Sequence, residues 1–360
     1  MRLNKDRIVI LLGAGCSVEA GIPSSNMMIN DLEALISGEK IEPDEKVEWE
    51  NYRELYSFIK SSIIYSFGLN KKFSEKANYN IEKLVDTLSE LEKRHAHSLY
   101  PFISEWDKKL IQYAGEDFIK IKELKKHIVN KLQNWVTITN YNDAHYYCKF
   151  IDFRKEYTFP LRVFSLNYDL CLEKHTTSYN LETGFDSTSR TWSWRKFEEI
   201  ENVSTVDIYL YKMHGSINWF RDSEENLTYS DEVVKISQPE LIFGTSYKLQ
   251  YTDPYLFFAT EFRKYTLEAQ MIITIGYGFG DEHINSMLSQ AVRNDKSKRI
   301  FSVMLNGNHD LVNIVLKPKD RNQIFVKNMK AKEFVTNELS ISKLEEMLPL
   351  TDQEDLPFSE

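Results

Sequence analysis

The hydrophobic pattern changes twice along the 360-residue chain. It begins with a short apolar run at residues 7–12, which is typical of a buried strand and ends at a glycine turn. From about residue 30 to residue 160, apolar residues recur instead at helical spacing, with charged residues between them. The clearest example is the set Ile81, Leu84, Val85, Leu88 and Leu91. This middle stretch predicts a block of roughly four to six helices.

Strand-like runs return after the helical block. They are short and rich in β-branched or aromatic residues, and several end in a small or polar residue before a helix-like segment. They cover residues 161–167, 207–215, 240–244, 270–278, 299–305 and 323–329. This alternation predicts an α/β fold, a parallel sheet with helices on both faces. Ligands of such sheets bind at the carboxyl ends of the strands, so the polar residues that close the strands are candidate site residues.

The two changes of pattern predict three regions. Residues 1–30 and 160–335 would form the α/β domain, and residues 31–159 a helical insertion. Residues 336–360 are acidic and carry apolar residues at helical spacing, which indicates a C-terminal helix followed by a tail.

Composition narrows the class of protein. The net charge of −9 disfavours a nucleic-acid-binding surface, which usually needs a basic patch, so we expect no direct nucleic-acid binding. No run reaches the roughly eighteen apolar residues of a membrane span, so we expect no membrane contact. The three cysteines are far apart, which disfavours a disulfide framework and a zinc module and predicts a reducing, cytoplasmic location without a metal.

The glycine turn after the first strand reads Gly13-Ala14-Gly15-Cys16-Ser17, and continues to Gly21-Ile22-Pro23. Glycines at such a turn let backbone amides approach a pyrophosphate, and Ser17 could add a hydroxyl. The turn is neither the dehydrogenase fingerprint, because Val18 stands where a small residue is needed, nor a Walker loop, because Gly-Lys-Ser/Thr is absent. The alternative is a tight strand-to-helix turn that binds no ligand.

Four motifs in order resemble the sirtuin family. The turn GAGCSVEAGIP is similar to the sirtuin pattern GAGxSxxxGIP, and Ser165-Leu166-Asn167-Tyr168-Asp169 is similar to its Thr-Gln-Asn-Ile-Asp strand end. Met213-His214-Gly215-Ser216 resembles the sirtuin His-Gly motif, and residues 276–285 resemble the late loop of sirtuin-like bacterial defence proteins. The resemblance implies a Rossmann-type fold with a large helical insertion.

Two departures separate the chain from the protein deacylases of that family. Ser24-Ser25-Asn26 stands where deacylases carry Asp-Phe-Arg, and the chain cannot build their four-cysteine zinc module. The pattern instead resembles NAD-hydrolysing effectors of bacterial anti-phage systems such as Thoeris, and sirtuin-like subunits paired with a DNA-translocating ATPase or a short Argonaute. The resemblance implies NAD as the substrate, which is cleaved to nicotinamide and ADP-ribose, and an abortive-infection role.

The chemistry of that cleavage indicates two catalytic residues. Nicotinamide leaves as a neutral group, so the site must hold the ribose hydroxyls and deliver water to an oxocarbenium-like centre. The amide of Asn167 can hold a hydroxyl and a water, and a neutral His214 can accept a proton. Asp169 is a supporting candidate that orients Asn167 or contacts ribose. The alternatives are helix caps for Asn167 and Asp169 and a buried strand-end histidine for His214.

The late loop supplies the remaining candidates. The resemblance assigns Gly276, Tyr277 and Gly278 to the adenosine half of NAD, with Asp281 or Asn285 reaching a ribose or adenine edge. Close packing by the glycines and helix capping by Asp281 are the alternatives.

The sequence leaves rival functions open. The leading hypothesis is a NAD glycohydrolase that a protein partner or homo-oligomer formation switches on. Its rivals are a NAD or ADP-ribose sensor subunit without turnover, an NAD-dependent deacylase, and a structural subunit of a nuclease or helicase complex. Hydrolysis and cyclisation of NAD are not distinguished.

Overall fold

The computed structural model describes residues 7–42, 47–69, 79–93, 108–115, 117–176, 180–198, 206–231, 236, 239–242 and 252–348. This described part divides into two compact units. The first unit consists of the described residues of Met1–Gly21, Asn140–Glu240 and Gln250–Glu360. The second consists of those of Ile22–Thr139 and Leu241–Leu249.

The first unit is built on a seven-stranded sheet, in which every neighbouring pair of strands is parallel. The strand order is β3-β4-β2-β1-β7-β8-β9. The strands are β1 (Ile8–Leu12), β2 (Leu161–Ser165), β3 (Leu181–Glu182), β4 (Ile208–Lys212), β7 (Met271–Ile275), β8 (Arg299–Met304) and β9 (Ile324–Asn328). The sheet confirms the predicted parallel α/β fold.

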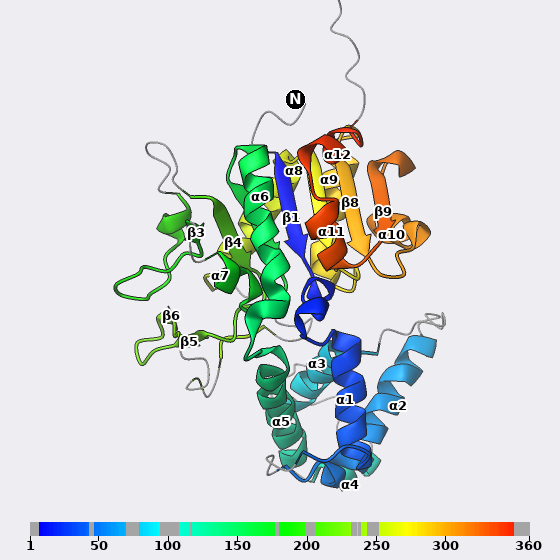
Figure 1. Ribbon diagram of the computed structural model, residues 1–360. Coiled ribbons are helices and arrows are strands. Elements are labelled where there is room, and N and C mark those ends of the chain that lie inside the picture. Colours follow the sequence, from blue (N-terminus) through cyan, green and yellow to red (C-terminus); the bar gives the residue numbers. More distant parts are fainter. Residues whose placement is uncertain are drawn as a thin grey trace, which may run out of the picture. The chain divides into compact units, whose positions relative to one another are not determined.

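Helices cover both faces of this sheet (Figure 1). One face carries α6 (Lys149–Tyr157), α11 (Ala331–Asn337) and α12 (Ile341–Glu345). The other carries α8 (Tyr255–Glu268), α9 (Glu282–Asn294) and α10 (His309–Leu316). Because both faces are covered, all five residues of β1, β2, β4 and β7 are buried, and their apolar runs are continuous rather than alternating.

The strand order creates a switch point beside β1. The chain places β2 and β4 on one side of β1, and β7, β8 and β9 on the other. Leu12, the last residue of β1, pairs with Ser165 of β2 and Ile275 of β7, so these three strands end at the same level. In open parallel sheets the crevice outside the carboxyl ends at such a point is where ligands bind.

The second unit is helical. It contains α1 (Ser25–Ser37), α2 (Arg53–Leu69), α3 (Ile81–Glu92), α4 (Lys108–Ala114) and α5 (Ile119–Val136), with the 3-10 turn η3 (Trp49–Tyr52). Helix α3 packs on α5. Fully buried apolar residues at helical spacing form that contact, and they include Ile81, Leu84 and Leu88 of α3 and Ile121, Leu124, Ile128 and Leu132 of α5. The periodicity in the sequence therefore identified the packed faces of both helices.

The unit boundaries differ from the predicted ones at both ends of the helical stretch. Residues 140–159 fall in the first unit, where the 3-10 turn η5 (Tyr141–Cys148) leads into α6. The cause is local packing, since the hydroxyl of Tyr157 accepts hydrogen bonds from the amides of Arg7 and Ile8 at 2.6 and 3.1 Å. Residues 22–30 fall in the second unit, because α1 packs on η3 and α3.

Some elements differ from the sequence prediction. An antiparallel hairpin of β5 (Trp219–Arg221) and β6 (Leu227–Tyr229), and the short edge strand β3, were not predicted. Residues 240–242 form no named strand, and the rest of the run predicted at 240–244 lies outside the described residues. The C-terminal region begins in α11, continues in α12, and lies outside the described residues from 349 onward.

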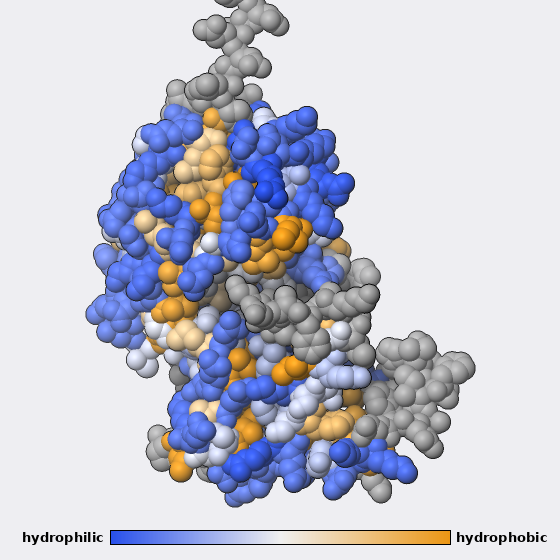
Figure 2. Space-filling view, turned by 90° about the vertical axis from the view of Figure 1, so that its right-hand side faces the viewer, coloured by the Kyte–Doolittle hydropathy of each residue, from blue (hydrophilic) through white to orange (hydrophobic). Residues whose placement is uncertain are grey.

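No helix within the described ranges has the length and apolar character needed to cross a membrane. Hydrophilic residues dominate the face drawn in Figure 2, and its apolar residues form separate small patches. The picture agrees with a sequence in which 28% of the residues are charged.

Candidate functional site

Four loops meet at the carboxyl edge of the sheet in the first unit. They follow β1, β2, β4 and β7, and they contain the four motifs found in the sequence. Direct contacts join them in pairs, as described below, so residues far apart in the chain form one cluster at the switch point.

The loops after β1 and β7 cross at backbone distance. The amide of Gly13 donates to the carbonyl of Ile275, and the amide of Gly15 donates to the carbonyl of Gly276, both at 2.9 Å. A Cβ on Gly276 would lie 2.1 Å from the amide nitrogen of Cys16, and Gly276 has a φ of +66°. Close approach thus requires glycine there, whereas a Cβ on Gly278 would meet nothing within 4 Å.

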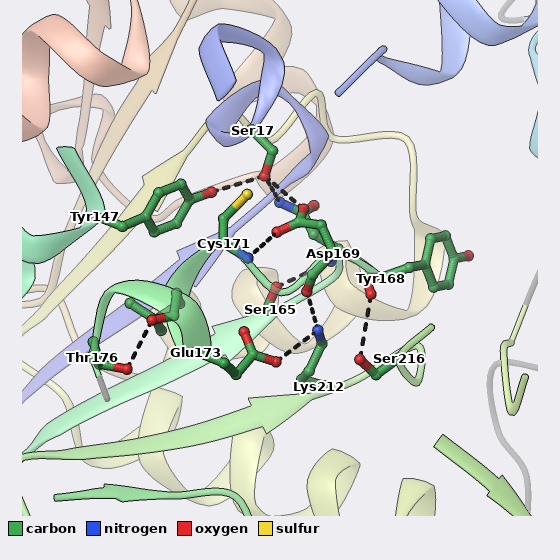
Figure 3. Close-up of polar contacts among 12 residues, drawn as sticks. Ser17, Tyr147, Ser165, Tyr168, Asp169, Cys171, Glu173, Thr176, Lys212 and Ser216 are labelled. Carbon is green, nitrogen blue, oxygen red and sulfur yellow. Dashed lines mark hydrogen bonds and ion pairs between the residues drawn. The ribbon is translucent and has the colours of Figure 1, made fainter. Parts of the chain in front are cut away.

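Ser17 is fully buried at the centre of the cluster (Figure 3). Its hydroxyl donates to Oδ2 of Asp169 at 2.7 Å, and lies 2.8 Å from the hydroxyl of Tyr147 in η5. It also accepts a hydrogen bond from Nδ2 of Asn167 at 3.0 Å. These hydrogen bonds join the loops after β1 and β2 to η5, and the contact of this hydroxyl with a phosphate stays a prediction.

Asn167 lies two residues beyond β2 and is held on both sides. Its Nδ2 donates to the carbonyl of Gly13 at 3.0 Å as well as to Ser17, and its backbone amide donates to the hydroxyl of Ser165 at 3.1 Å. Its side chain is nearly buried, with 8% exposed. These bonds fix the amide plane and leave Oδ1 to accept a hydrogen bond from a water or hydroxyl.

Asp169 supports the loop after β2 with both its side chain and its backbone. Its Oδ2 accepts from Ser17, and its Oδ1 accepts from the amide of Cys171 at 2.9 Å, ahead of α7 (Cys171–His175). Its backbone carbonyl accepts a hydrogen bond from the buried ammonium of Lys212. Ser17 thus links Asp169 to Asn167 by two hydrogen bonds, and the supporting role of Asp169 stays a prediction.

The buried Lys212 and the half-buried Glu173 form an ion pair beside this loop (Figure 3). Nζ of Lys212, the last residue of β4, lies 3.0 Å from Oε1 of Glu173. Burial raises the pKa of Glu173, and the attraction of Lys212 opposes that rise. A lysine inside the apolar run at 207–215 was a signal that sequence reasoning did not use.

His214 and Asp281 bridge the edge of the sheet. Nε2 of His214 lies 3.3 Å from Oδ2 of Asp281, and both side chains are buried. His214 follows β4 and Asp281 follows β7, so their contact spans the ends of β2 and β1. Asp281 is also the N-cap of α9, since its Oδ1 accepts from the amides of His283 and Ile284 at 2.9 and 3.3 Å.

Tyr277 and Asn285 stabilise the loop after β7 by hydrogen bonds within the segment that follows this strand. The hydroxyl of Tyr277 donates to Oδ1 of Asn285 at 2.8 Å, and Nδ2 of Asn285 donates to the carbonyl of Phe279 at 2.8 Å. Tyr277 is buried. Both polar groups of Asn285 are therefore occupied by the loop itself in this structure.

The remaining predicted residues lie along the first loop. Ala14 is exposed, and Gly21 is exposed with a φ of +94° and open space where a Cβ would stand. Ile22 and Pro23 fall in the second unit. The sequence candidates of the first unit thus gather at one edge, while these two belong to the other unit.

Two ionisable groups in the cluster, the Cys16 thiol and the Tyr147 hydroxyl, stay protonated over a wide pH range because their pKa values are raised. Burial raises the pKa of the Cys16 thiol to about 12 and raises the pKa of Tyr147 well above its usual range. Cys16 is therefore a thiol and not a nucleophile at neutral pH. In the part of the chain that the structure describes, no group of three or more histidine, cysteine or acidic side chains is arranged to hold a metal ion.

Comparisons with known proteins show what the chain is similar to. Residues 161–331 match the family model of a SIR2-like domain, a range that includes Asn167 and His214 but not the Gly13 loop. None of the curated proteins matches the chain. Similar solved structures include a Sir2 homologue in complex with NAD, at 14% identity over 94% of this chain and 90% of that one, with a TM-score of 0.45. Another is Sir2 with a p53 peptide and NAD+, at 12% identity over 93% and 92%, with a TM-score of 0.40.

Proposed function

We propose that this chain is a NAD glycohydrolase, which hydrolyses NAD to nicotinamide and ADP-ribose. One observation carries the proposal. Asn167 and His214 follow the ends of the neighbouring strands β2 and β4 at the switch point. The buried Gly13 holds the amide of Asn167, and the buried Asp281 holds the imidazole of His214. Each keeps one polar atom that these partners do not use, Oδ1 of Asn167 and Nδ1 of His214.

Asn167 would hold the reacting sugar. The bond from nicotinamide to ribose breaks through an oxocarbenium-like state, and the leaving group is neutral, so no strong acid is needed. Because Nδ2 of Asn167 is committed to Gly13 and Ser17, Oδ1 is directed to accept a hydrogen bond from a ribose hydroxyl or a water. A fixed acceptor of this kind loses no orientational freedom when the transition state forms.

His214 would act as the base. The carboxylate of Asp281 can only accept a hydrogen bond, so it favours the neutral tautomer with the proton on Nε2. Nδ1 then carries the lone pair that removes a proton from water or from a ribose hydroxyl. The same carboxylate stabilises the imidazolium that results, as a triad aspartate does.

The first loop and Gly278 would receive the rest of the dinucleotide. Ala14 is exposed at the start of the loop, two residues after the end of β1. Space around Gly21 and Gly278 lets a ligand approach the backbone closely. The N-terminus of α9 is less suited to bind a phosphate, because the amides of His283 and Ile284 already donate to the carboxylate of Asp281.

Two rival functions make different predictions. A sensor of NAD or ADP-ribose would bind these ligands without turnover, and the buried His214–Asp281 pair disfavours it because binding alone needs no oriented base. A deacylase would need an acyl-lysine peptide, and its test is release of that acyl group.

We also propose that a protein partner or self-assembly controls the activity, as in an abortive-infection effector of anti-phage defence. This part rests on the resemblance of the sequence motifs. Sizing of the purified protein with and without products of neighbouring genes tests it, and a monomer under all conditions would contradict it.

The central experiment measures nicotinamide and ADP-ribose released from NAD by chromatography. Wild type is compared with Asn167→Ala and His214→Ala, and Asn328→Ala at the exposed end of β9 is the matched control. We expect both site variants to lose turnover while they keep their fold, and the control to retain it.

The other outcomes separate the rivals. Binding of ADP-ribose without turnover by wild type, alone or with a partner, would favour the sensor. A cyclic product would change the reaction to cyclisation. Turnover that survives both substitutions would refute the assignment of the residues.

A further inference from the structure

We propose that Tyr147 is a positioning residue, which fixes the direction of the Asn167 amide through the hydroxyl of Ser17. Only the expected effect of Tyr147 on kcat rests on the proposed function; its effect on the Asn167 amide does not. Tyr147 lies in η5, outside every motif of the sequence, and no signal in the sequence marked it.

The contact between Tyr147 and Ser17 is well formed. Their oxygens are 2.8 Å apart, and both side chains are almost fully buried (Figure 3). No water competes for a hydroxyl in such a place, so each hydrogen bond must be matched within the protein.

Counting protons assigns every donor at Ser17. A serine hydroxyl has one hydrogen and two lone pairs. The neighbour Oδ2 of Asp169, at 2.7 Å, accepts only, so the serine hydrogen points at it. Ser17 must then accept from the other two neighbours, the hydroxyl of Tyr147 and Nδ2 of Asn167. Tyr147 keeps its proton for this bond because burial raises its pKa.

This assignment permits only one orientation of the Asn167 amide. Nδ2 faces two acceptors, the carbonyl of Gly13 and the oxygen of Ser17. A flipped amide would place Oδ1 against both, and neither has a hydrogen to offer. The hydrogen bond from Tyr147 matters because it occupies one lone pair of the Ser17 hydroxyl. The Ser17 hydrogen therefore cannot rotate toward Tyr147 and stays directed at Asp169. Oδ1 is thereby held on the side where it can act.

The neighbouring Tyr146 provides an internal comparison. Its hydroxyl donates to the backbone carbonyl of Cys16, so it contacts the same loop. That bond supports the loop but has no influence on the hydrogen of Ser17. Tyr157 is a second comparison, because its buried hydroxyl accepts from two amides at the other end of β1.

The kinetic test compares the three conservative variants Tyr147→Phe, Tyr146→Phe and Tyr157→Phe. We expect Tyr147→Phe to lower kcat by about threefold to tenfold, the worth of one buried hydrogen bond, with the KM for NAD and the affinity for ADP-ribose within about twofold of wild type. Tyr157→Phe should lower the melting temperature at least as much as Tyr147→Phe does, but it should leave kcat unchanged. A purely structural role for Tyr147 would make the two variants alike.

A double-mutant cycle tests the route through Ser17. In the Ser17→Ala background, Tyr147→Phe should have no further effect on kcat, because the mediator is absent. Equal losses in both backgrounds would overturn the proposal, as would a kcat of Tyr147→Phe equal to wild type.

A spectroscopic test does not depend on turnover of NAD. In the 15N-labelled protein, the side-chain amide signal of Asn167 is identified by its absence in Asn167→Asp. We expect its protons to exchange slowly with solvent in wild type and in Tyr157→Phe, and faster in Tyr147→Phe. If wild type lacks NAD turnover but shows this pattern, the proposed function fails while the positioning role stands. Equal exchange in all three proteins would refute the positioning role.

Discussion

Substitution of Gly276 by alanine should be far more damaging than the same change two residues later. A Cβ on Gly276 would lie 2.1 Å from the amide nitrogen of Cys16 and 2.3 Å from the carbonyl carbon of Gly15. Both are backbone atoms and cannot rotate away. The two loops would have to separate by about 1 Å, to restore an ordinary contact.

The expected cost can be built from three contributions. Alanine at a φ of +66° costs about 1 kcal/mol. Separation of the loops weakens the hydrogen bonds from Gly15 to Gly276 and from Gly276 to Val303, at about 1 kcal/mol each. Overpacking adds about 1–3 kcal/mol, and the less flexible unfolded chain returns about 0.4–1 kcal/mol. The net loss of stability is about 3–6 kcal/mol.

Gly278→Ala is the matched control. Its Cβ would meet no atom within 4 Å, and its φ lies outside the left-handed region. We expect its free energy of unfolding to remain within about 1 kcal/mol of wild type. Urea unfolding of both variants, followed by tryptophan fluorescence, measures the difference. Similar midpoints for the two variants would refute the reasoning that the loop crossing requires glycine at position 276.

Three further predictions concern side chains. Asp281→Asn should keep the N-cap of α9, so the free energy of unfolding should change by about 1 kcal/mol or less. The same variant should lower kcat for NAD by about 10–100-fold, because an amide cannot stabilise the His214 imidazolium. An unchanged kcat would contradict the role of the His214–Asp281 pair. Among the three thiols, only the partly exposed Cys148 should react quickly with a disulfide reagent at pH 8 in the folded protein, and rapid reaction of Cys16 or Cys171 would contradict their burial. Burial raises the pKa of Cys16 from 9.0 to about 12, so the folded state retains a proton that the unfolded chain releases in this range, and stability falls as the pH rises. Between pH 8 and 10 wild type should lose about 1.4 kcal/mol more than Cys16→Ala in urea unfolding, and parallel curves would count against it.

The main strands and helices could be predicted from the sequence because each of them has a hydrophobic pattern within its own residues. Strands such as β2 and β7 are buried on both faces, so their apolar runs stand out and match the structure within a few residues. Helices α3 and α5 have one buried face, and their spacing identified it. The elements that were missed, such as the hairpin of β5 and β6, are three residues long, and pairing partners rather than periodicity define them.

The candidate site was predictable only in part, for a related reason. Asn167 and His214 stand at strand ends, where position in the sequence indicates position in space. The role of Ser17 depends on Tyr147, which is 130 residues away in a segment with helical character. Nothing in the spacing around Tyr147 distinguishes it from a core aromatic residue. Likewise, residues 140–157 looked like part of the helical block, because the contacts that place them in the first unit join residues far apart in the chain, such as Tyr157 with the start of β1 and Tyr146 with Cys16.

The central place of β1 has a consequence for how the protein is made. Ile8–Leu12 leaves the ribosome long before its sheet neighbours β2 and β7, which start at residues 161 and 271. During that interval a fully apolar strand has no partner, and such a segment is prone to pair with other chains. The helical unit lies almost wholly within the first gap, and once folded it shortens the loop that β1 and β2 must close. We therefore expect the slow step of refolding to be the recruitment of β1, and chaperone dependence to persist until β7 has been synthesised.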